Sequence, residues 1–206
     1  VMIPKLLICI CLVSSLILAR PVSYPGAWTA SLRLIPDHKQ AIIHYSPSTK
    51  YSIGYHVHNA YESLNAHYVQ VNSLLKRWNN PSSQANLYLY SGAGIWSRGT
   101  DQNRSVYLGS SADWETQRVF TSLSSSFISY HDHNSLSEHR ARMGLAPYIG
   151  DYGDLHTWIM LEAYYHSIDT NSIQIHPVLR FFSGVHLLEI SINPQKKLGL
   201  FYIHRF

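Results

Sequence analysis

The sequence predicts an all-β protein: a single antiparallel up-and-down transmembrane β-barrel of about 12 strands, with 10 strands as the alternative. Three observations predict this fold. Apolar and polar residues alternate with a period of two along nearly the whole chain after residue 19, and no segment sustains a helical period. Charged residues make up 14% of the chain, against about 25% in ordinary soluble proteins, while tyrosine (15) and tryptophan (5) are abundant. After residue 19, no apolar run approaches the about 18 residues that a spanning helix needs.

The N-terminal segment MIPKLLICICLVSSLILA has one early cation, Lys5, and then an apolar run that ends in the small residue Ala19. This pattern is typical of a secretory signal peptide. We therefore expect a signal peptide over residues 1–19, removed on export, and one barrel domain over residues 20–206. Both cysteines, Cys9 and Cys11, lie in the removed segment, so we expect neither a disulfide nor a thiolate metal site in the mature chain.

The alternation divides the barrel domain into twelve candidate strands, an even number such as bacterial single-chain barrels have. They are 28–36, 40–46, 51–58, 66–78, 84–96, 104–115, 118–130, 138–149, 155–167, 173–182, 185–192 and 198–206.

The connections between these strands alternate between two kinds, as outer loops and inner turns do in such barrels. The predicted outer loops include 59–65, 97–103 and 131–137. The predicted inner turns include 46–50, 79–83, 115–118, 150–154 and 183–184.

Charged residues indicate which face of each strand points inward, since an arginine or lysine on the lipid face costs about 2–4 kcal/mol at the bilayer midplane. In the strand 138–149, charges and Tyr148 share one face, and Ala141, Met143 and Leu145 share the other. We therefore expect nine charged side chains to form a salt-bridged network in the lumen. They are Lys76, Asp113, Glu115, Glu138, Arg140, Arg142, Glu162, Arg180 and Glu189.

A soluble β-sandwich or lipocalin-like barrel shows the same alternation turned inside out, so alternation alone does not place the chain in a membrane. The segment LGLFYIHRF carries Leu198, Leu200, Tyr202 and Phe206 on one face. It resembles the C-terminal insertion signal of outer-membrane β-barrel proteins, from which it departs at His204. The resemblance implies insertion by the outer-membrane assembly machinery, contact with outer-membrane lipids, and location in the outer membrane of a Gram-negative bacterium.

Two further segments, AHYVQVNSLLKRWNNPSSQANLYLYSGAG and LAPYIGDYGDLHTWIMLEA, are similar to segments of an uncharacterised group of outer-membrane proteins from Gram-negative bacteria. They cover less than a third of the chain. The group has no established activity, so the resemblance implies location and fold alone.

Histidine is frequent, at 13 residues, and two pairs stand two residues apart: His56 with His58, and His131 with His133. Imidazoles so placed can share zinc or copper. The competing interpretation is that they are solvated loop histidines, and we expect no cofactor.

Histidine also stands near serine in the sequence, as His166 beside Ser167 and His44 near Ser46. Outer-membrane lipid hydrolases use serine and histidine together. Such catalysis requires a base that meets the nucleophile in space and a third, orienting group, and neither follows from adjacency in sequence.

The function that the sequence favours is a narrow passive channel or a structural envelope protein with a polar, salt-bridged lumen. The alternatives are an outer-membrane lipid-modifying hydrolase and a copper- or zinc-related binding protein of the periplasm or outer membrane. The net charge of +4 comes from scattered lysines and arginines, which is not the pattern of a nucleic-acid-binding protein. The substrate, the openness of the lumen and the oligomeric state are left open.

Overall fold

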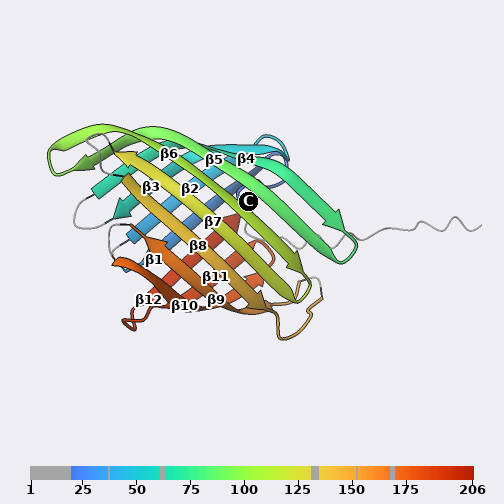
Figure 1. Cartoon of the computed structure of the whole chain (residues 1–206). Coiled ribbons are helices and arrows are strands. Elements are labelled where there is room, and N and C mark those ends of the chain that lie inside the picture. Colours follow the sequence, from blue (N-terminus) through green and yellow to red (C-terminus); the bar gives the residue numbers. More distant parts are fainter. Residues whose placement is uncertain (1–19, 37, 61–63, 131–134, 152, 168–169) are drawn as a thin grey trace, which may run out of the picture.

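The computed structural model describes residues 20–206 except 37, 61–63, 131–134, 152 and 168–169. The predicted signal peptide lies outside the described residues. Twelve strands form one closed antiparallel barrel in which each strand pairs with its neighbours in sequence (Figure 1). The strands are β1 (Ala27–Ile35), β2 (His38–Ser46), β3 (Tyr51–Ala60), β4 (Leu64–Asn80), β5 (Ser83–Arg98), β6 (Asp101–Thr116), β7 (Val119–Tyr130), β8 (Ser135–Leu145), β9 (His156–His166), β10 (Thr170–Ser183), β11 (His186–Ile192) and β12 (Leu198–Arg205).

The barrel closes where β1 pairs with β12, from Thr29 opposite Arg205 to Leu34 opposite Leu200. Just beyond β12, the backbone of Phe206 exchanges two hydrogen bonds with that of Trp28, at 2.8 and 3.0 Å. Closure pairs every strand with two neighbours, as a sheet surrounded by lipid requires. The predicted all-β fold and the predicted number of strands, 12, are confirmed.

The largest difference from the predicted strand limits is in β8, which ends at Leu145 and not at residue 149. Pro147 follows two residues later and has no amide hydrogen to donate to a strand ladder. Tyr148, predicted on the inward face, therefore lies outside the strand, where it is exposed and donates a hydrogen bond to the Leu155 carbonyl. All other strand ends lie within three residues of the prediction.

The connections between strands lie alternately at the two ends of the barrel. At the terminal end, where β1 begins and β12 ends, the predicted turns 46–50, 79–83, 115–118 and 183–184 join the strands. At the distal end, where β1 leads into β2, the strands extend into the predicted outer loops. β5 ends at Arg98 and β6 begins at Asp101, so the predicted loop 97–103 is a short turn, and the predicted loops 59–65 and 131–137 lie partly outside the described residues. The longest separation between consecutive strands, from Leu145 to His156, lies at the terminal end. Because consecutive connections alternate between the ends of an up-and-down barrel, the predicted turns and the predicted loops lie at opposite ends.

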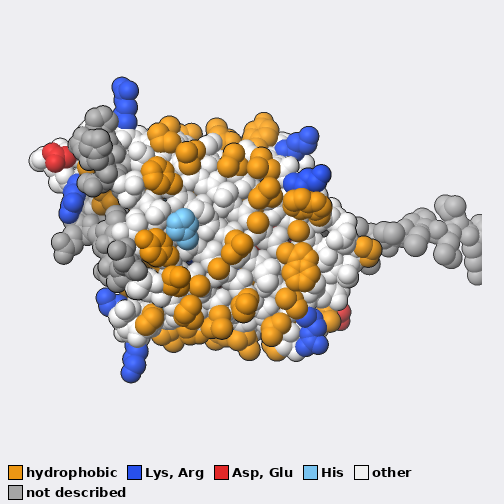
Figure 2. All heavy atoms as spheres, in the orientation of Figure 1, with side chains coloured by type: hydrophobic (Ala, Val, Ile, Leu, Met, Phe, Trp, Pro, Cys, Tyr) orange, Lys and Arg blue, Asp and Glu red, His pale blue; other side chains and the backbone are white. Residues whose placement is uncertain are grey.

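The outer wall of the barrel is apolar. Leu123, Met143 and Ile173 are 64%, 61% and 67% exposed, although each belongs to a strand. In Figure 2, apolar side chains spread over the visible wall, while lysine, arginine, aspartate and glutamate lie at its two rims. A barrel in water would turn these apolar side chains inward, so the distribution is that of a barrel that faces lipid.

Aromatic side chains form a ring on the outer wall at the terminal end. The members of this aromatic ring, each 41–56% exposed, are Trp28, Tyr51, Trp78, Trp114, Tyr148 and Phe206. Girdles of this kind mark the membrane–water interface in outer-membrane barrels. Among the described residues, no helix is long and apolar enough to cross a membrane.

Candidate functional site

The polar side chains of each alternating strand line the lumen. The pairing of β8 with β9 places charged side chains of the two strands directly opposite one another. Arg142 stands directly opposite Glu162 in this pairing, and Glu138 opposite His166. Side chains at directly opposed positions lie on the same face of the sheet and interact. The structure places eight of the nine predicted network residues in the lumen, all except Lys76.

The centre of the network is a chain of four alternating charges. Arg142 Nε lies 2.5 Å from Glu162 Oε2, and Arg142 Nη1 lies 3.1 Å from Glu189 Oε2. Arg180 Nη2 completes the chain at 2.7 Å from Glu189 Oε1. All four side chains are at most 10% exposed. Each charge is therefore compensated by a direct partner, as buried charges require.

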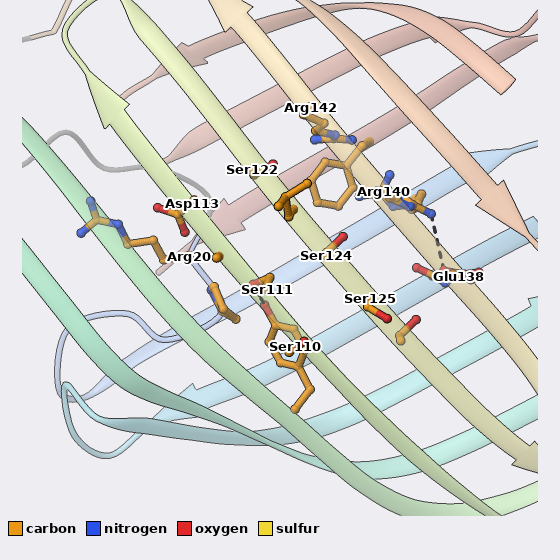
Figure 3. A pocket seen from close by; sticks show the side chains of 18 of the residues that line it. Arg20, Ser110, Ser111, Asp113, Ser122, Ser124, Ser125, Glu138, Arg140 and Arg142 are labelled. Atoms are coloured by element: carbon orange, nitrogen blue, oxygen red, sulfur yellow. Dashed lines mark hydrogen bonds and ion pairs between the residues drawn. The ribbon is translucent and has the colours of Figure 1, made fainter. Parts of the chain in front are cut away.

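A second group of charges lies nearer the terminal end. Arg20 Nη2 contacts Glu115 Oε1 at 3.0 Å. Asn86 donates a hydrogen bond of 2.7 Å to Asp113 and accepts one of 2.7 Å from Arg77. Arg20 precedes the first strand, so the alternation could not assign it to a face. Its side chain nevertheless reaches into the lumen beside Asp113 (Figure 3).

Lys76, predicted in the network, does not join it. A bulge between Leu74 and Lys76 interrupts the pairing of β4 with β5 and shifts the alternation by one residue. Lys76 is therefore exposed, with its ammonium 5.9 Å from the centre of the Trp78 ring. Arg77 takes the inward position and contacts Asn86.

The lumen contains more arginines than the predicted network. Arg33 of β1 lies over the Phe201 ring at 4.2 Å, and Arg205 is 6% exposed. Alternation along β1, with Trp28 and Leu32 facing outward, could have found Arg33. In the described part of the chain, seven inward arginines stand against five carboxylates, which leaves two positive charges in excess. The arginines are Arg20, Arg33, Arg77, Arg140, Arg142, Arg180 and Arg205, and the carboxylates are Asp113, Glu115, Glu138, Glu162 and Glu189.

Side chains fill much of the lumen and leave separate cavities. Phe120, Trp158, Met160 and Val178 form a buried apolar cluster within it. A cavity of about 260 Å³ is lined by charged residues of the network and by serines of β6 and β7, several of which Figure 3 shows around one space. A cavity of about 200 Å³ shares lining residues with it, and another of about 230 Å³ lies toward the distal end. Any passage through this lumen is therefore narrow.

The C-terminal face lies on the outer wall as its pattern predicts. Leu198, Leu200 and Phe206 are 68%, 38% and 56% exposed, and Tyr202 shares their side of the strand. His204, which breaks the apolar pattern, places its Nδ1 atom 3.3 Å from that of His186.

Of the two predicted histidine pairs, one lies within the described residues. His56 and His58 both lie buried in the lumen, with ring centres 6.0 Å apart. His56 Nδ1 is hydrogen-bonded to Gln70, and His58 stacks on His38 with ring centres 4.2 Å apart. His131 and His133 lie outside the described residues. The described part of the chain has four further buried histidines that sequence spacing did not single out as ligands: His38, His44, His166 and His176.

Neither serine that the sequence pairs with histidine is arranged as a nucleophile. The Ser167 hydroxyl accepts a hydrogen bond from the Ser137 amide, and the Ser46 hydroxyl accepts one from Ser23. A different pair does meet: Ser125 Oγ lies 2.9 Å from His139 Nδ1, and both residues are exposed on the outer wall.

No protein-family model and no curated protein matches this chain. Among solved structures, it is similar to a KdgM porin, at a TM-score of 0.48 and 11% identity over 87% of this chain and 98% of that one. It is also similar to OccK11 (OpdR) of Pseudomonas aeruginosa, at a TM-score of 0.45 and 7% identity over 88% of this chain and 66% of that one. At these identities neither similarity transfers a function.

Proposed function

We propose that this chain is an outer-membrane β-barrel whose lumen is a narrow passive channel for ions and small hydrophilic solutes. The observation that carries the proposal is an ionic lumen with cavities inside an apolar wall. Ionisable residues at membrane depth are costly, and in membrane proteins they mark pathways for ions and solutes.

The charges of the lumen favour anions over cations. Arg33 has no acidic partner within salt-bridge distance among the described residues, and its guanidinium lies over Phe201. It lines the same cavity as Arg140 and Arg142. With two positive charges in excess, the lumen attracts anions, because a confined low-dielectric pore strengthens the field of each charge.

Conductance in a planar lipid bilayer tests the channel function. We expect the refolded barrel to conduct in small steps, with a reversal potential in a KCl gradient that indicates anion preference. Arg33→Gln should reduce this preference, because it removes a lumen cation without leaving a carboxylate unpaired. The exposed rim residue Lys39 provides the matched control, since Lys39→Gln removes one charge outside the lumen. A folded, inserted barrel that never conducts would instead support a structural role.

We also propose that residues 1–19 direct export and are removed, and that the barrel resides in the outer membrane of a Gram-negative bacterium. The apolar wall and the aromatic ring support this location. The terminal end, which carries the aromatic ring, then faces the periplasm, and the distal end faces outward.

A second candidate function, hydrolysis of membrane lipids, is favoured by the Ser125–His139 contact. The pair borders a hollow of about 390 Å³ on the outer wall, lined by small residues such as Ala112 and Ala141. No carboxylate or amide is hydrogen-bonded to His139 in the described part of the chain; its ring stacks on Tyr165. Release of fatty acid from phospholipid, lost in Ser125→Ala, would establish this activity, and equal release by both proteins would reject it.

A further inference from the structure

We propose that the distal end of the lumen holds a binding site for one divalent ion of the zinc class, formed by His38, Glu138 and His166. The inference is independent of whether the lumen conducts.

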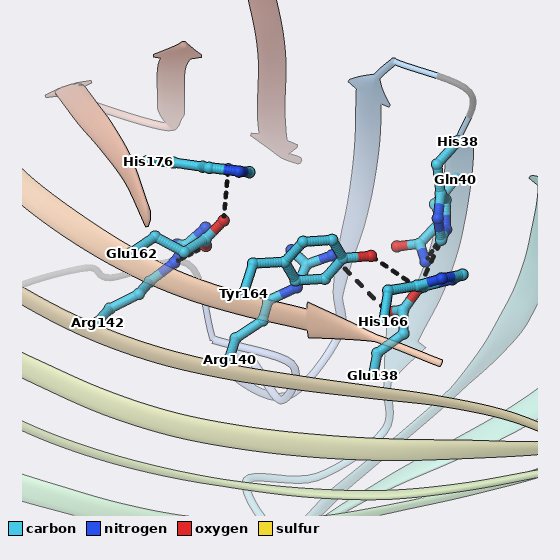
Figure 4. Close-up of polar contacts among 9 residues, drawn as sticks. All are labelled: His38, Gln40, Glu138, Arg140, Arg142, Glu162, Tyr164, His166 and His176. Carbon is cyan, nitrogen blue, oxygen red and sulfur yellow. Dashed lines mark hydrogen bonds and ion pairs between the residues drawn. The ribbon is translucent and has the colours of Figure 1, made fainter. Parts of the chain in front are cut away.

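Three strands from two sides of the barrel bring these side chains together. Glu138 of β8 and His166 of β9 are directly paired across neighbouring strands. His38 is the first residue of β2, which is separated from β9 by four strands in the order of the barrel, and it reaches the pair across the lumen. Figure 4 shows the His38 and His166 rings converging on the Glu138 carboxylate.

The donor atoms have nearly the spacing that a metal ion requires. His38 Nε2 lies 3.3 Å and His166 Nε2 lies 3.7 Å from Glu138 Oε1, and one donor atom from each residue lies within 4.8 Å of the others. Zinc binds nitrogen and oxygen at about 2.0–2.2 Å, so tetrahedral ligand atoms lie about 3.3 Å apart. Small rotations of the side chains would therefore seat the ion.

The contact between His38 and Glu138 brings two electron-donor atoms together. The Gln40 amide nitrogen lies 2.9 Å from His38 Nε2 and donates to it, so this nitrogen presents a lone pair. The lone pair and the Glu138 carboxylate, both electron donors, then stand 3.3 Å apart. A metal ion between them would take this lone pair in place of the Gln40 N–H group, and rotation of the Gln40 amide would then offer its oxygen as a further ligand.

Surrounding groups hold the donors in place, as the groups around metal ligands generally do. The three side chains are buried, at 2%, 7% and 5% exposure for His38, Glu138 and His166. Arg140 Nη2 lies 3.6 Å from the second oxygen of Glu138, and the Tyr164 hydroxyl donates to the first at 3.5 Å.

The site selects the zinc class of ions and borders a cavity at the distal end. Two imidazoles and one carboxylate suit zinc, copper or nickel, whereas calcium requires six to eight oxygen ligands. Arg140 already offsets the single carboxylate charge, which further disfavours ions held by charge alone. His38 and His166 line the 230 Å³ cavity together with Pro36, Asn193 and Gln195 of the distal connections, so the site borders a cavity at this end of the lumen.

Calorimetric titration of Zn²⁺ into the refolded, untagged chain tests the site. We expect one tight site, and a loss of affinity of at least about 100-fold in His38→Asn and in His166→Asn, because replacing even a group behind a ligand costs about 10–100-fold. His44→Asn is the matched control, since His44 is a buried histidine of the same strand and stands outside the cluster. Each variant is first shown to be folded by its heat-dependent shift on gels.

Two results would overturn the site: no Zn²⁺ binding by the parent chain, or unchanged affinity in both ligand variants. The second result would place the ion elsewhere, such as at the exposed pair His186 and His204.

Conductance measured with and without Zn²⁺ tests this site separately from the channel function. Because the ion joins two sides of the barrel, it should block current in a conducting parent and leave His166→Asn open. Zn²⁺ binding by a barrel that never conducts would support the site and contradict the channel alone.

Discussion

At the scale of single residues, the lumen depends on compensation between neighbouring charges. Arg142 contacts both Glu162 and Glu189, so it holds two carboxylates that otherwise would lie side by side in a space with little water. A buried ion pair contributes little over a well-packed apolar alternative, but loss of one partner leaves an uncompensated charge. Because Arg142 compensates both carboxylates, its removal should destabilise the barrel more than the loss of either contact alone.

We expect Arg142→Gln to lower the free energy of unfolding by about 3–5 kcal/mol, as removal of one partner from a buried pair does. Urea unfolding of the barrel in lipid vesicles, followed by tryptophan fluorescence, measures this change. Arg118→Gln is the control, because Arg118 is exposed in the turn before β7 and donates to the carbonyls of Ala146 and Pro147. Equal stabilities for the two variants would contradict the charge-compensation account.

Single residues on the outer wall also determine whether the barrel inserts into lipid. Leu123 lies in the middle of β7, whereas Leu145 is the last residue of β8, at the terminal end. Trp114 of the aromatic ring stands opposite Thr121, and Leu145 lies closer to the end of the barrel than this pair. An arginine on the lipid face costs about 2–4 kcal/mol at the midplane and about 0–1 kcal/mol near the interface.

Leu123→Arg should therefore impair membrane insertion strongly, and Leu145→Arg only slightly. The folded fraction after refolding into vesicles, read from the heat-dependent shift on gels, compares the two. If Leu123→Arg inserts as well as the parent chain, this wall does not face lipid.

At the scale of single elements, β12 has two tasks: it closes the barrel against β1, and its outward face carries the predicted insertion signal. Six residue pairs join it to β1, and the Phe206 backbone adds two hydrogen bonds to Trp28 beyond them. The Phe206 side chain takes no part in this closure, since it is 56% exposed on the outer wall. A substitution of that side chain therefore tests the insertion signal without changing the backbone pairing that closes the barrel.

We expect Phe206→Asp to reduce the amount of barrel in the outer membrane of cells severalfold, with a much smaller effect on refolding of the purified chain in detergent. The exposed turn residue Gln195 serves as the control site, as Gln195→Asp adds the same charge outside the signal. Similar membrane levels for the two variants would remove the support for an insertion signal.

At the scale of the whole molecule, polarity is inverted relative to a soluble barrel, with charge inside and apolar side chains outside. This inversion predicts where the protein resides, because the apolar wall is stable only against lipid or detergent. It also predicts that the folded barrel resists detergent, because every strand is paired on both sides.

We expect the chain in the outer-membrane fraction, running faster on gels unless boiled, and with a mass that corresponds to loss of residues 1–19. Cell fractionation with mass spectrometry measures all three. Recovery from the periplasm without detergent would be incompatible with a lipid-facing wall.

The sequence by itself determined the strands and the face on which most side chains lie. Both follow from alternation with a period of two, which is a local property that neighbouring residues carry. Thus Glu138, Arg140 and Arg142 are placed inward by the sequence alone, and the structure agrees. Alternation fails where the backbone departs from it, as at the bulge before Lys76 and at the end of β8 before Pro147.

Only the tertiary structure decided which inward side chains meet. His38 joins Glu138 and His166 because barrel closure brings β2 across the lumen from β8 and β9. Such an encounter depends on strand number, register and the width of the closed barrel, and no local pattern encodes it. For the same reason, the sequence could pair Ser46 with His44 by adjacency, while the serine that contacts a histidine, Ser125, does so through the register between two strands.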